Sequence, residues 1–209
     1  MPHPHHHPVP ATEEYRNLRA ELGHKRVGII GCGGLGSNAA WMLVRSGIGA
    51  LVLADYDLVE ESNLDRQFFF QDQIGLPKTE ALATNLMRID PVVQLELFQE
   101  HVDEHNFAKI FVDIDLLIEA VDSAHDKAIL VAACSEHLPD VPIVSASGLA
   151  GYGSTNDIVT RHLMGSLWMV GDLVSEVSAE RPLFASRVCV AAGHEAHMAI
   201  RILLGHPEA

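Results

Sequence analysis

Four glycines within six residues restrict the backbone of this chain more tightly than any other stretch. Gly31, Gly33, Gly34 and Gly36 form the sequence GCGGLG, which follows the apolar run 27–30 and precedes a periodic segment. In the pattern GxGxxG the first glycine permits a tight turn, the second lets a phosphate approach the backbone, and the third allows close helix–strand packing. The N–H groups at the start of the helix are then free to bind an anion. The pattern predicts a strand, a phosphate-binding turn and a helix.

A carboxylate follows at the distance that a nucleotide-binding fold of this kind requires. The apolar run 51–54 is followed by Asp55, roughly twenty residues after the glycines. A carboxylate in this place accepts hydrogen bonds from ribose hydroxyls. A glycine turn without a ligand is the alternative, and the position of Asp55 favours nucleotide binding over it. The kind of nucleotide stays open, because the same pattern occurs in proteins that bind dinucleotides.

Apolar runs and helical periodicity alternate along the rest of the chain, which favours a doubly wound α/β fold. Strands are expected at 27–30, 51–54, 93–98, 116–121 and 143–147, and helices at 13–22, 37–46, 79–89, 124–134 and 188–204. Pro77 suits a first helical position. Residues 164–186 have weak periodicity and are expected to form a crossover loop that faces the substrate. We expect one Rossmann-like domain at 13–209, with a mostly parallel sheet and helices on both faces, after a disordered His- and Pro-rich tail at 1–12.

Composition excludes several classes of protein. No apolar run reaches the roughly 18 residues of a membrane span, and the first residues lack the apolar segment of a signal peptide. Three cysteines without a CxxC pair favour a reducing compartment, here the cytoplasm, and leave no paired-thiolate zinc site. A net charge of −14 would repel a phosphate backbone, so nucleic acid is not the expected partner.

Two cations and one carboxylate favour a triphosphate over a dinucleotide. Arg66 lies in the polar stretch 55–67, and Lys78 begins the next expected helix. An arginine and a lysine that converge on the phosphates suit the higher charge of a triphosphate. Asp122 ends a predicted buried strand at the same edge of the sheet, a suitable place for a Mg²⁺ ligand. An NAD-dependent oxidoreductase is the alternative, although no catalytic acid or base for a nicotinamide pocket is evident.

Four motifs in order give a more specific resemblance. They are GCGGLGS, DYDLVEESNLDRQ, GLPKTEAL and AVDS. Together they resemble the ThiF/MoeB group of adenylyltransferases, relatives of the ubiquitin-activating enzymes, over residues from about 26 to 205. The last third, with SGLAGYG, MVGDLVSE and SRVCVAAGHEAHMAIRILLG, resembles the short ThiF subgroup of thiamine biosynthesis.

The resemblance implies a set of site residues around ATP and Mg²⁺. Asp55 would bind the ribose, Asp122 would hold Mg²⁺, and other side chains would surround the triphosphate. The implied nucleotide-binding residues are Gly31, Gly33, Gly34, Gly36, Asp55, Asp57, Asn63, Arg66, Gln67 and Lys78. The implied catalytic residues are Arg66, Lys78, Asp122 and Arg19, of which Arg19 would reach the site of a partner subunit in a homodimer.

The implied reaction is adenylation of the C-terminal carboxylate of a small Gly-Gly-terminated sulfur-carrier protein similar to ThiS, with release of pyrophosphate. The chain departs from many members of the group, because it has no CxxC pairs for zinc and no cysteine in 164–187 for a covalent sulfur step. Adenylation of a tRNA-bound carboxylate is a further alternative, against which the net charge of −14 counts.

Overall fold

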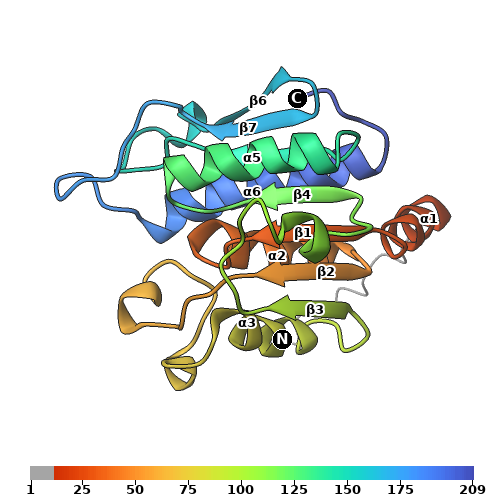
Figure 1. Cartoon of the computed structure of the whole chain (residues 1–209), viewed down its shortest axis with the longest axis horizontal. Helices are drawn as coiled ribbons and strands as arrows, with labels where there is room; N and C mark the ends of the chain where they lie inside the picture. Colours follow the sequence, from red (N-terminus) through yellow and green to blue (C-terminus); the bar gives the residue numbers. More distant parts are fainter. Residues whose placement is uncertain (1–11) are drawn as a thin grey trace, which may run out of the picture.

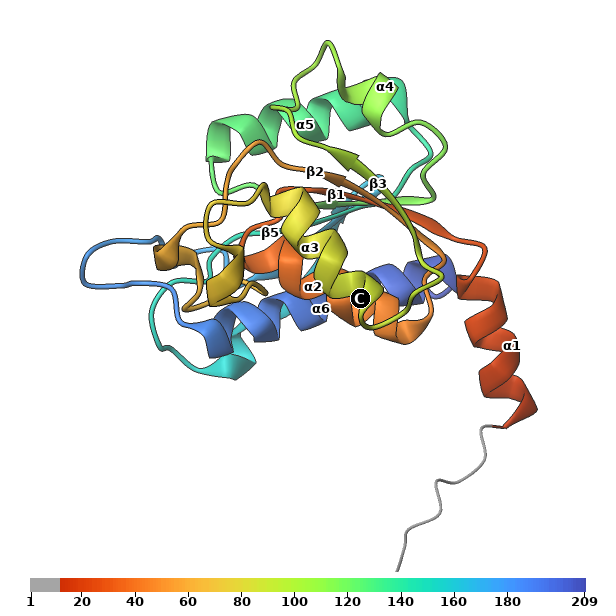
Figure 2. The same cartoon turned by 90° about the horizontal axis from the view of Figure 1, so that it is seen from below.

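The structure is a computed structural model, and it describes residues 12–209. The predicted tail therefore lies outside the described residues except for Thr12. The hydroxyl of Thr12 accepts a hydrogen bond from the backbone N–H of Tyr15 at 3.1 Å and caps α1 (Glu13–Leu22). This helix agrees with the prediction and projects from the body of the molecule (Figure 2).

A seven-stranded sheet forms the centre of the molecule (Figure 1). Its strands are β1 (Arg26–Ile30), β2 (Ala50–Ala54), β3 (Gln94–Phe98), β4 (Leu116–Glu119), β5 (Ile143–Ala146), β6 (Val159–Met164) and β7 (Leu167–Gly171). They are arranged in the order β3-β2-β1-β4-β5-β7-β6, and each neighbouring pair is parallel except β6 and β7. The predicted mostly parallel, doubly wound sheet is confirmed.

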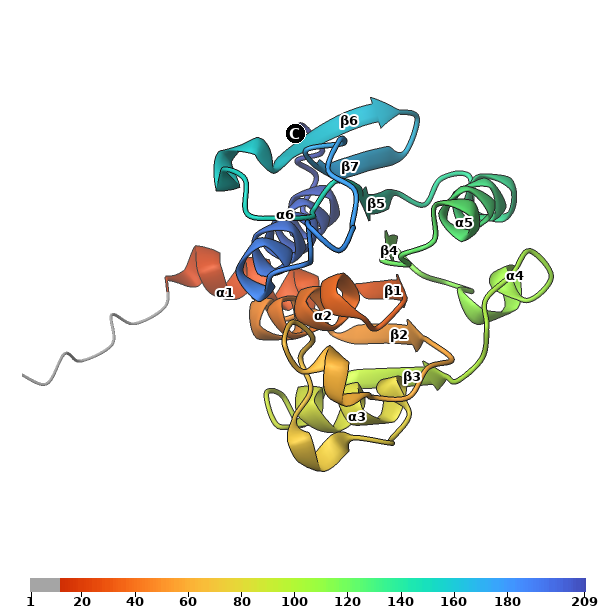
Figure 3. The ribbon, with the colours of Figure 1, turned by 90° about the vertical axis from the view of Figure 1, so that its left-hand side faces the viewer.

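Helices cover both faces of the sheet (Figures 2 and 3). On one face lie α2 (Gly34–Ser46), α3 (Lys78–Met87) and α6 (Ala185–Leu203), and on the other lie α4 (Phe107–Ile110) and α5 (Ala124–His137). Three short 3₁₀ helices span Glu61–Asn63, Gln71–Gln73 and Thr155–Asp157. Each face has its own apolar core, one under α2 and α6 and one under α4 and α5. None of the helices in the described part of the chain has the length and hydrophobicity to span a bilayer.

Burial explains why the central strands were easy to predict. In β2 and β4 every residue is buried, as expected for parallel strands covered by helices on both faces. The strand order reverses between β1 and β4, because the chain continues from β1 toward one edge of the sheet and from β4 toward the other. This place is the switch point of the sheet. Ligands of doubly wound sheets bind in the crevice outside the carboxyl ends of the strands at such a point. The fold therefore places the glycine turn, which follows β1, beside the residues that follow β4.

The prediction of a loop at 164–186 is wrong in part, because β7 lies within it and β6 ends at its first residue. β6 is the edge strand, and its last four residues are exposed, so it lacks the alternation of a half-buried strand. α4 was also not predicted, since a helix of four residues has too few turns to show periodicity.

Several predicted boundaries also differ. α2 begins at Gly34, within the glycine turn, and not at Ser37. Pro77 is the N-cap of α3 and not its first helical residue. β4 ends at Glu119, so Asp122 lies in the loop beyond the strand.

Candidate active site

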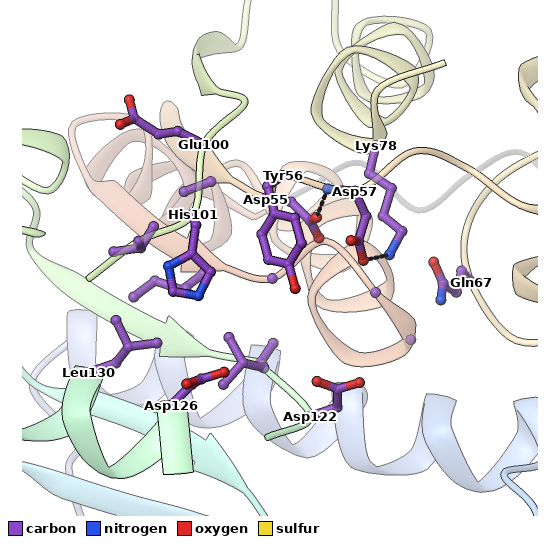
Figure 4. Close-up of a pocket in the computed structure, with 18 of the residues that line it drawn as sticks. Asp55, Tyr56, Asp57, Gln67, Lys78, Glu100, His101, Asp122, Asp126 and Leu130 are labelled. Atoms are coloured by element: carbon purple, nitrogen blue, oxygen red, sulfur yellow. Dashed lines mark hydrogen bonds and ion pairs between the residues drawn. The ribbon is translucent and has the colours of Figure 1, made fainter. Parts of the chain in front are cut away.

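A cavity opens at the carboxyl ends of β1, β2 and β4 (Figure 4). Three loops supply its floor: the glycine turn after β1, residues 55–57 after β2, and residues 120–122 after β4. Side chains from further along the chain complete it, namely Arg66, Gln67, Lys78, Glu100, His101, Val102, Asp126, Leu130 and Leu183. Most of the predicted nucleotide-binding residues are therefore gathered around one cavity at the switch point of the sheet.

The glycine turn is packed too closely to accept side chains at two positions. Gly31 has a φ of +86°, and a Cβ there would lie 2.8 Å from the carbonyl oxygen of Ala120. A Cβ on Gly36 would lie 1.9 Å from the carbonyl oxygen of Gly31. At Gly33, which lines the cavity, the nearest atom to a Cβ would be 3.8 Å away, so the space there is open. The turn is thus closed toward the protein and open toward the cavity.

The start of α2 offers unpaired backbone donors to the cavity. The first backbone hydrogen bond of the helix runs from the N–H of Ser37 to the carbonyl of Gly33 at 3.0 Å. The N–H groups of Gly34, Leu35 and Gly36 precede it, and the first donors of a helix have no partner within the helix. With the positive end of the helix dipole, these donors form a site for an anion.

Asp55 is held at the end of β2 by backbone donors. One carboxylate oxygen accepts from the N–H of Cys32 at 2.6 Å, and the other accepts from the N–H of Asp57 at 2.8 Å. Burial raises the pKa of Asp55, while the charge of Lys78 and the two N–H donors oppose that rise. Each oxygen retains a further lone pair, so the fixed carboxylate can still accept from the hydroxyls of a sugar.

Lys78 reaches the cavity from the first residue of α3. Its Nζ lies 2.6 Å from a carboxylate oxygen of Asp57 (Figure 4). The Lys78 side chain is 8% exposed, whereas that of Asp57 is 46% exposed. The ammonium group is therefore desolvated and already has one anionic partner beside the cavity, which fixes its position near the glycine turn.

The loop before α3 brings Arg66 and Gln67 to the glycine turn. A Cβ on Gly34 would lie 3.9 Å from Cγ of Arg66, and one on Gly33 would lie 3.8 Å from Nε2 of Gln67. Arg66 Nη1 donates to the carbonyl of Ser62 at 2.9 Å and to a carboxylate oxygen of Asp65 at 2.6 Å, and these two contacts orient the guanidinium group. The Oε1 atom of Gln67 is buried and has no hydrogen-bond partner among the described residues, as expected of a group whose partner is a ligand or water.

Two polar residues of α2 that were not predicted fix this loop. Asn38 Nδ2 donates to the carbonyl of Gly34 at 2.7 Å and to that of Arg66 at 3.0 Å. The hydroxyl of Ser37 accepts from the N–H of Phe68 at 3.0 Å. Both residues are buried polar groups on a helix with an apolar face, which is the signal that could have identified them. They join the phosphate-binding helix to the arginine-bearing loop.

Asn63 and Arg19 lie outside the lining of the cavity. The side chain of Asn63 accepts from the N–H of Glu60 at 3.0 Å, so it shapes the loop that carries Arg66. Arg19 lies on α1 and donates to the carbonyl of Arg45 at 2.8 Å, near the C-terminal end of α2. In this single chain neither residue is brought to the glycine turn.

Asp122 lines the cavity in the loop after β4, with Asp126 on the first turn of α5 (Figure 4). No group of three or more His, Cys, Asp or Glu side chains among residues 12–209 is arranged to hold a metal ion. Mg²⁺ is commonly bound by one or two carboxylates together with substrate phosphates and water. A single exposed Asp122 beside a phosphate site therefore fits a magnesium ion that arrives with its nucleotide.

An aromatic pair that was not predicted stands at the other side of the cavity. The rings of Tyr56 and His101 have centroids 5.3 Å apart, and Val102 and Leu130 add apolar surface nearby. The charge of Asp57 and partial burial raise the pKa of Tyr56, so its phenol stays neutral. The two rings are tilted by 46° to each other, and a wall of aromatic and apolar side chains can border a planar base. Tyr56 stands between two predicted residues, but His101 is distant in sequence.

The three cysteines are poor nucleophiles in this structure. Burial and the charge of Asp55 raise the pKa of Cys32 well above its ordinary value. Burial raises the pKa of Cys134 to about 12 and also raises that of Cys189. Since the thiolate is the reactive form, these environments do not support covalent sulfur chemistry.

Comparison with known proteins identifies the relatives of the chain. The sequence profile described as "ThiF family" matches residues 12–209. "Ubiquitin-like modifier-activating enzyme 5" of Drosophila willistoni is 38% identical over 138 residues, which cover 60% of this chain and 33% of that protein. The protein of the same name from Caenorhabditis elegans is 36% identical over 136 residues, or 60% of this chain and 32% of that protein. The chain thus spans about a third of the length of these curated relatives.

Solved structures share the fold. The tRNA N6-threonylcarbamoyladenosine dehydratase TcdA of E. coli, in complex with ATP, has a TM-score of 0.82 at 23% identity, with 90% of this chain and 89% of that chain covered. E. coli MccB with ATP has a TM-score of 0.71 at 24% identity, with 91% of this chain and 60% of that chain covered. At these identities the likeness confirms the Rossmann-like α/β architecture.

Proposed function

The chain belongs to the ThiF family, and from that premise we propose that it is an adenylyltransferase. Its substrates would be ATP and the C-terminal carboxylate of a small, ubiquitin-like sulfur-carrier protein ending in Gly-Gly. One observation carries the proposal: Arg66, Gln67 and Lys78, from two separate segments, line the same cavity as the glycine turn and Asp122. This combination supplies both a nucleotide site and the positive charge that a triphosphate needs.

The contacts support one orientation for ATP. Asp55, fixed by two backbone donors, would accept from the ribose hydroxyls. The N–H groups at the start of α2 would bind the α-phosphate, because they precede the first hydrogen bond of the helix and Gly33 and Gly34 line the cavity. Lys78 and Arg66 would then meet the β- and γ-phosphates, and Tyr56 with its apolar neighbours would border the adenine.

Asp122 is the residue that would hold Mg²⁺, in agreement with its exposure in the cavity. When bound, the ion would neutralise phosphate charge and increase the polarisation of the phosphoryl oxygens. The residues of the chain supply the remaining electrostatic stabilisation, since Lys78 is desolvated and Arg66 is oriented by the carbonyl of Ser62.

The proposed reaction requires no general base. A carboxylate is ionised at neutral pH, and one of its oxygens would attack the α-phosphorus in line with the departing bridge oxygen. A bond forms between the carboxylate oxygen and the α-phosphorus, and the bond from that phosphorus to pyrophosphate breaks. The products are an acyl-adenylate and pyrophosphate. Lys78 and Arg66 would stabilise the charge that develops on the leaving group.

The choice of a ubiquitin-like carrier is supported by the relatives named as ubiquitin-like modifier-activating enzymes. The resemblance of residues 147–153, 169–176 and 186–205 to the short ThiF subgroup supports a carrier that serves thiamine biosynthesis. A homodimer is part of the same proposal, because Arg19 could then serve the cavity of a second copy. The net charge of −14 disfavours a carboxylate on tRNA as the substrate.

ATP–pyrophosphate exchange tests the function. Exchange should require a carrier protein ending in Gly-Gly, and a carrier without its last glycine should not support it. Arg66→Ala or Asp122→Ala should lower carrier-dependent exchange on the order of a hundredfold or more while the circular dichroism spectrum is unchanged. Wild-type exchange rates in both variants, or stabilisation of the protein by NAD and not by ATP with Mg²⁺, would refute the proposal.

A further inference from the structure

The segment between β7 and α6, residues 172–184, reaches the cavity from a distant part of the sequence. Leu183 is the one residue of the cavity lining that comes from beyond Leu130 in the part of the chain that the structure describes. In Figure 1 the segment extends at the same end of the sheet as the loops that follow β2. Val174 and Val177 are 80% and 65% exposed, so the segment also presents apolar side chains to solvent.

One buried arginine holds the base of this segment. Arg187, on the first turn of α6, is 4% exposed. Its Nη1 donates to the carbonyls of Gly153 and Ser154, each at 2.9 Å, and its Nη2 donates to a carboxylate oxygen of Asp172 at 2.7 Å. A single guanidinium group therefore joins α6 to the loop after β5 and to the residue that follows β7.

Asp172 connects Arg187 to the first residues of the segment 172–184. Its second carboxylate oxygen accepts from the N–H of Val174 at 2.9 Å and from that of Ser175 at 2.8 Å. Although burial alone would raise the pKa of Asp172, the hydrogen bonds from Ser175, Val174 and Arg187 lower it to about 2. The carboxylate is thus ionised and bonded on both oxygens at neutral pH.

The backbone around this ion pair has little freedom. A Cβ on Gly171, which has a φ of +130°, would lie 1.8 Å from the carbonyl oxygen of Ser147. A Cβ on Gly148 would lie 2.2 Å from a carboxylate oxygen of Asp172. Leu173 has a φ of +65°, which is rare for a residue other than glycine and persists only where the surroundings enforce it. The chain is therefore tightly placed where it leaves β5 and β7.

The tip of the segment, residues 178–182, has fewer contacts with other elements than the base has. Ser178 and Arg181 bond to each other through their backbones. Within the described chain, the hydrogen bond that joins the tip to another element runs from the N–H of Gly151 to the carbonyl of Pro182 at 2.9 Å. Leu183 is thus held between the loop after β5, at Gly151, and the first turn of α6, and Arg187 joins that loop and that turn to Asp172.

We propose that Arg187, acting through Asp172, is a positioning residue for the acyl substrate. It holds residues 172–184 against the cavity so that this segment contacts the chain that carries the carboxylate. The groups suited to ATP all lie within residues 30–130, and the segment contributes the apolar Leu183, which has no donor for a phosphate. We call the contacts of Arg187 with Gly153, Ser154 and Asp172 the clamp. The positioning role rests on the proposed function, whereas the clamp is a structural claim that can be tested without it.

Arg187→Lys is the test, because a lysine keeps the charge but cannot make the forked contacts with two carbonyls and a carboxylate. In pyrophosphate exchange, KM for the Gly-Gly carrier should rise on the order of tenfold, while KM for ATP stays within about twofold. Asp172→Asn should act in the same direction. The matched control is Arg201→Lys on the same helix, where the ion pair with Glu208 is exposed, and it should change neither KM.

Hydrogen–deuterium exchange provides a second readout that does not depend on catalysis. Arg187→Lys should speed exchange of the amides in 148–154 and 172–184, and leave those of the glycine turn unchanged. Faster exchange without a change in carrier KM would overturn the positioning role, and so would an equal rise in KM for ATP. Unchanged amide exchange would overturn the clamp. If the wild-type protein shows no carrier-dependent exchange, the proposed function fails and the positioning role fails with it, while the amide data still decide the clamp.

Discussion

The glycine turn and the segment 172–184 line the same cavity but are held by different means. The turn is fixed by backbone packing, since a Cβ on Gly36 would lie 1.9 Å from a carbonyl oxygen of Gly31. The segment starts from a backbone that is packed as closely at Gly171, but beyond that residue it is held by the side chains of one buried ion pair between Arg187 and Asp172. Backbone packing leaves no choice of position, whereas a side-chain clamp can be loosened by one substitution. The side of the cavity suited to phosphate is thus rigid, and the side that we propose for the acyl substrate is adjustable.

The largest effect is expected where the rigid region is overfilled. Gly36→Ala would force a Cβ against the backbone of Gly31, so the free energy of unfolding should fall by about 3 kcal/mol or more. Urea denaturation measures this directly. Stability equal to wild type would mean that the turn is not closely packed, which would break the comparison between the two regions.

Gly33→Ala is the matched control for that variant. The φ of Gly33 is −79°, and a Cβ would have open space toward the cavity. The fold should be retained, with a change in unfolding free energy within about 0.5 kcal/mol. Stabilisation by ATP in thermal unfolding should be lost, because the added methyl group occupies the approach of the phosphate. Full stabilisation by ATP would argue that the nucleotide binds elsewhere.

Removal of a cation at the phosphate side should affect catalysis more than stability. Lys78→Met should lower carrier-dependent exchange on the order of a hundredfold, because the leaving pyrophosphate loses a desolvated ammonium group. Its partner Asp57 is 46% exposed, so solvent can take over its charge and the fold should remain. Asp57→Asn should cause a smaller loss in the same assay. A larger loss from Asp57→Asn would show that the carboxylate, and not the ammonium, is the essential group.

The sequence predicts those parts of the fold and the site that depend on a residue's own backbone or on a short local pattern. The glycine turn, the burial of β1, β2 and β4, and the polar stretch that carries Arg66 are all local features, so their places followed from period and spacing. β6 could not be found in this way, because an edge strand with an exposed half has no periodic apolar face.

The rest of the site depends on contacts between distant residues. His101 reaches Tyr56, and Asn38 bonds to the carbonyl of Arg66, only because the sheet order places their segments side by side. Arg187 belongs to the same class, since its three partners come from two loops. The spacing of residues along one chain does not record such contacts. The resemblance implies a place for Asn63 around the triphosphate; in the structure its side chain accepts from the N–H of Glu60, and its contact with a nucleotide stays a prediction.

A second buried ionisable group on α6, Glu195, sharpens the contrast with the paired Arg187. Burial raises the pKa of Glu195 well above its ordinary value, opposed by Lys127 and reinforced by Glu119. Its carboxylate oxygens have no hydrogen-bond partner among residues 12–209. The folded state therefore binds a proton that the unfolded state releases, so stability is highest below the unfolded pKa and falls as pH rises toward the folded value.

Glu195→Gln should remove this pH dependence. Between about pH 5 and about pH 8 the unfolding free energy of the wild-type protein should fall relative to that of the variant, by at most about 1.4 kcal/mol per pH unit. Urea denaturation of both proteins at the two pH values measures the difference, in which the titration of groups that do not interact with Glu195 cancels. Parallel pH profiles would show that Glu195 has a partner that keeps it ionised.

The smallest effect is expected at Cys189, whose thiol contacts α2. Cys189 lies on α6 with its Sγ 3.6 Å from Oδ1 of Asn38, and burial raises its pKa. Since this thiol is neutral and the proposed adenylation uses no thiolate, Cys189→Ala should change the exchange rate by less than about twofold. A loss of activity with intact folding would mean that sulfur chemistry takes place on this chain after all.

The direct test of the cavity is to identify which bond of ATP is broken in it. The purified protein is incubated with ATP, Mg²⁺ and a Gly-Gly-terminated carrier, and the carrier is analysed by mass spectrometry after rapid acid quenching. A carrier with AMP attached to its terminal carboxylate, formed together with an equal amount of pyrophosphate, is the expected result. Formation of ADP and phosphate, or an unmodified carrier when ATP is consumed, would contradict the account.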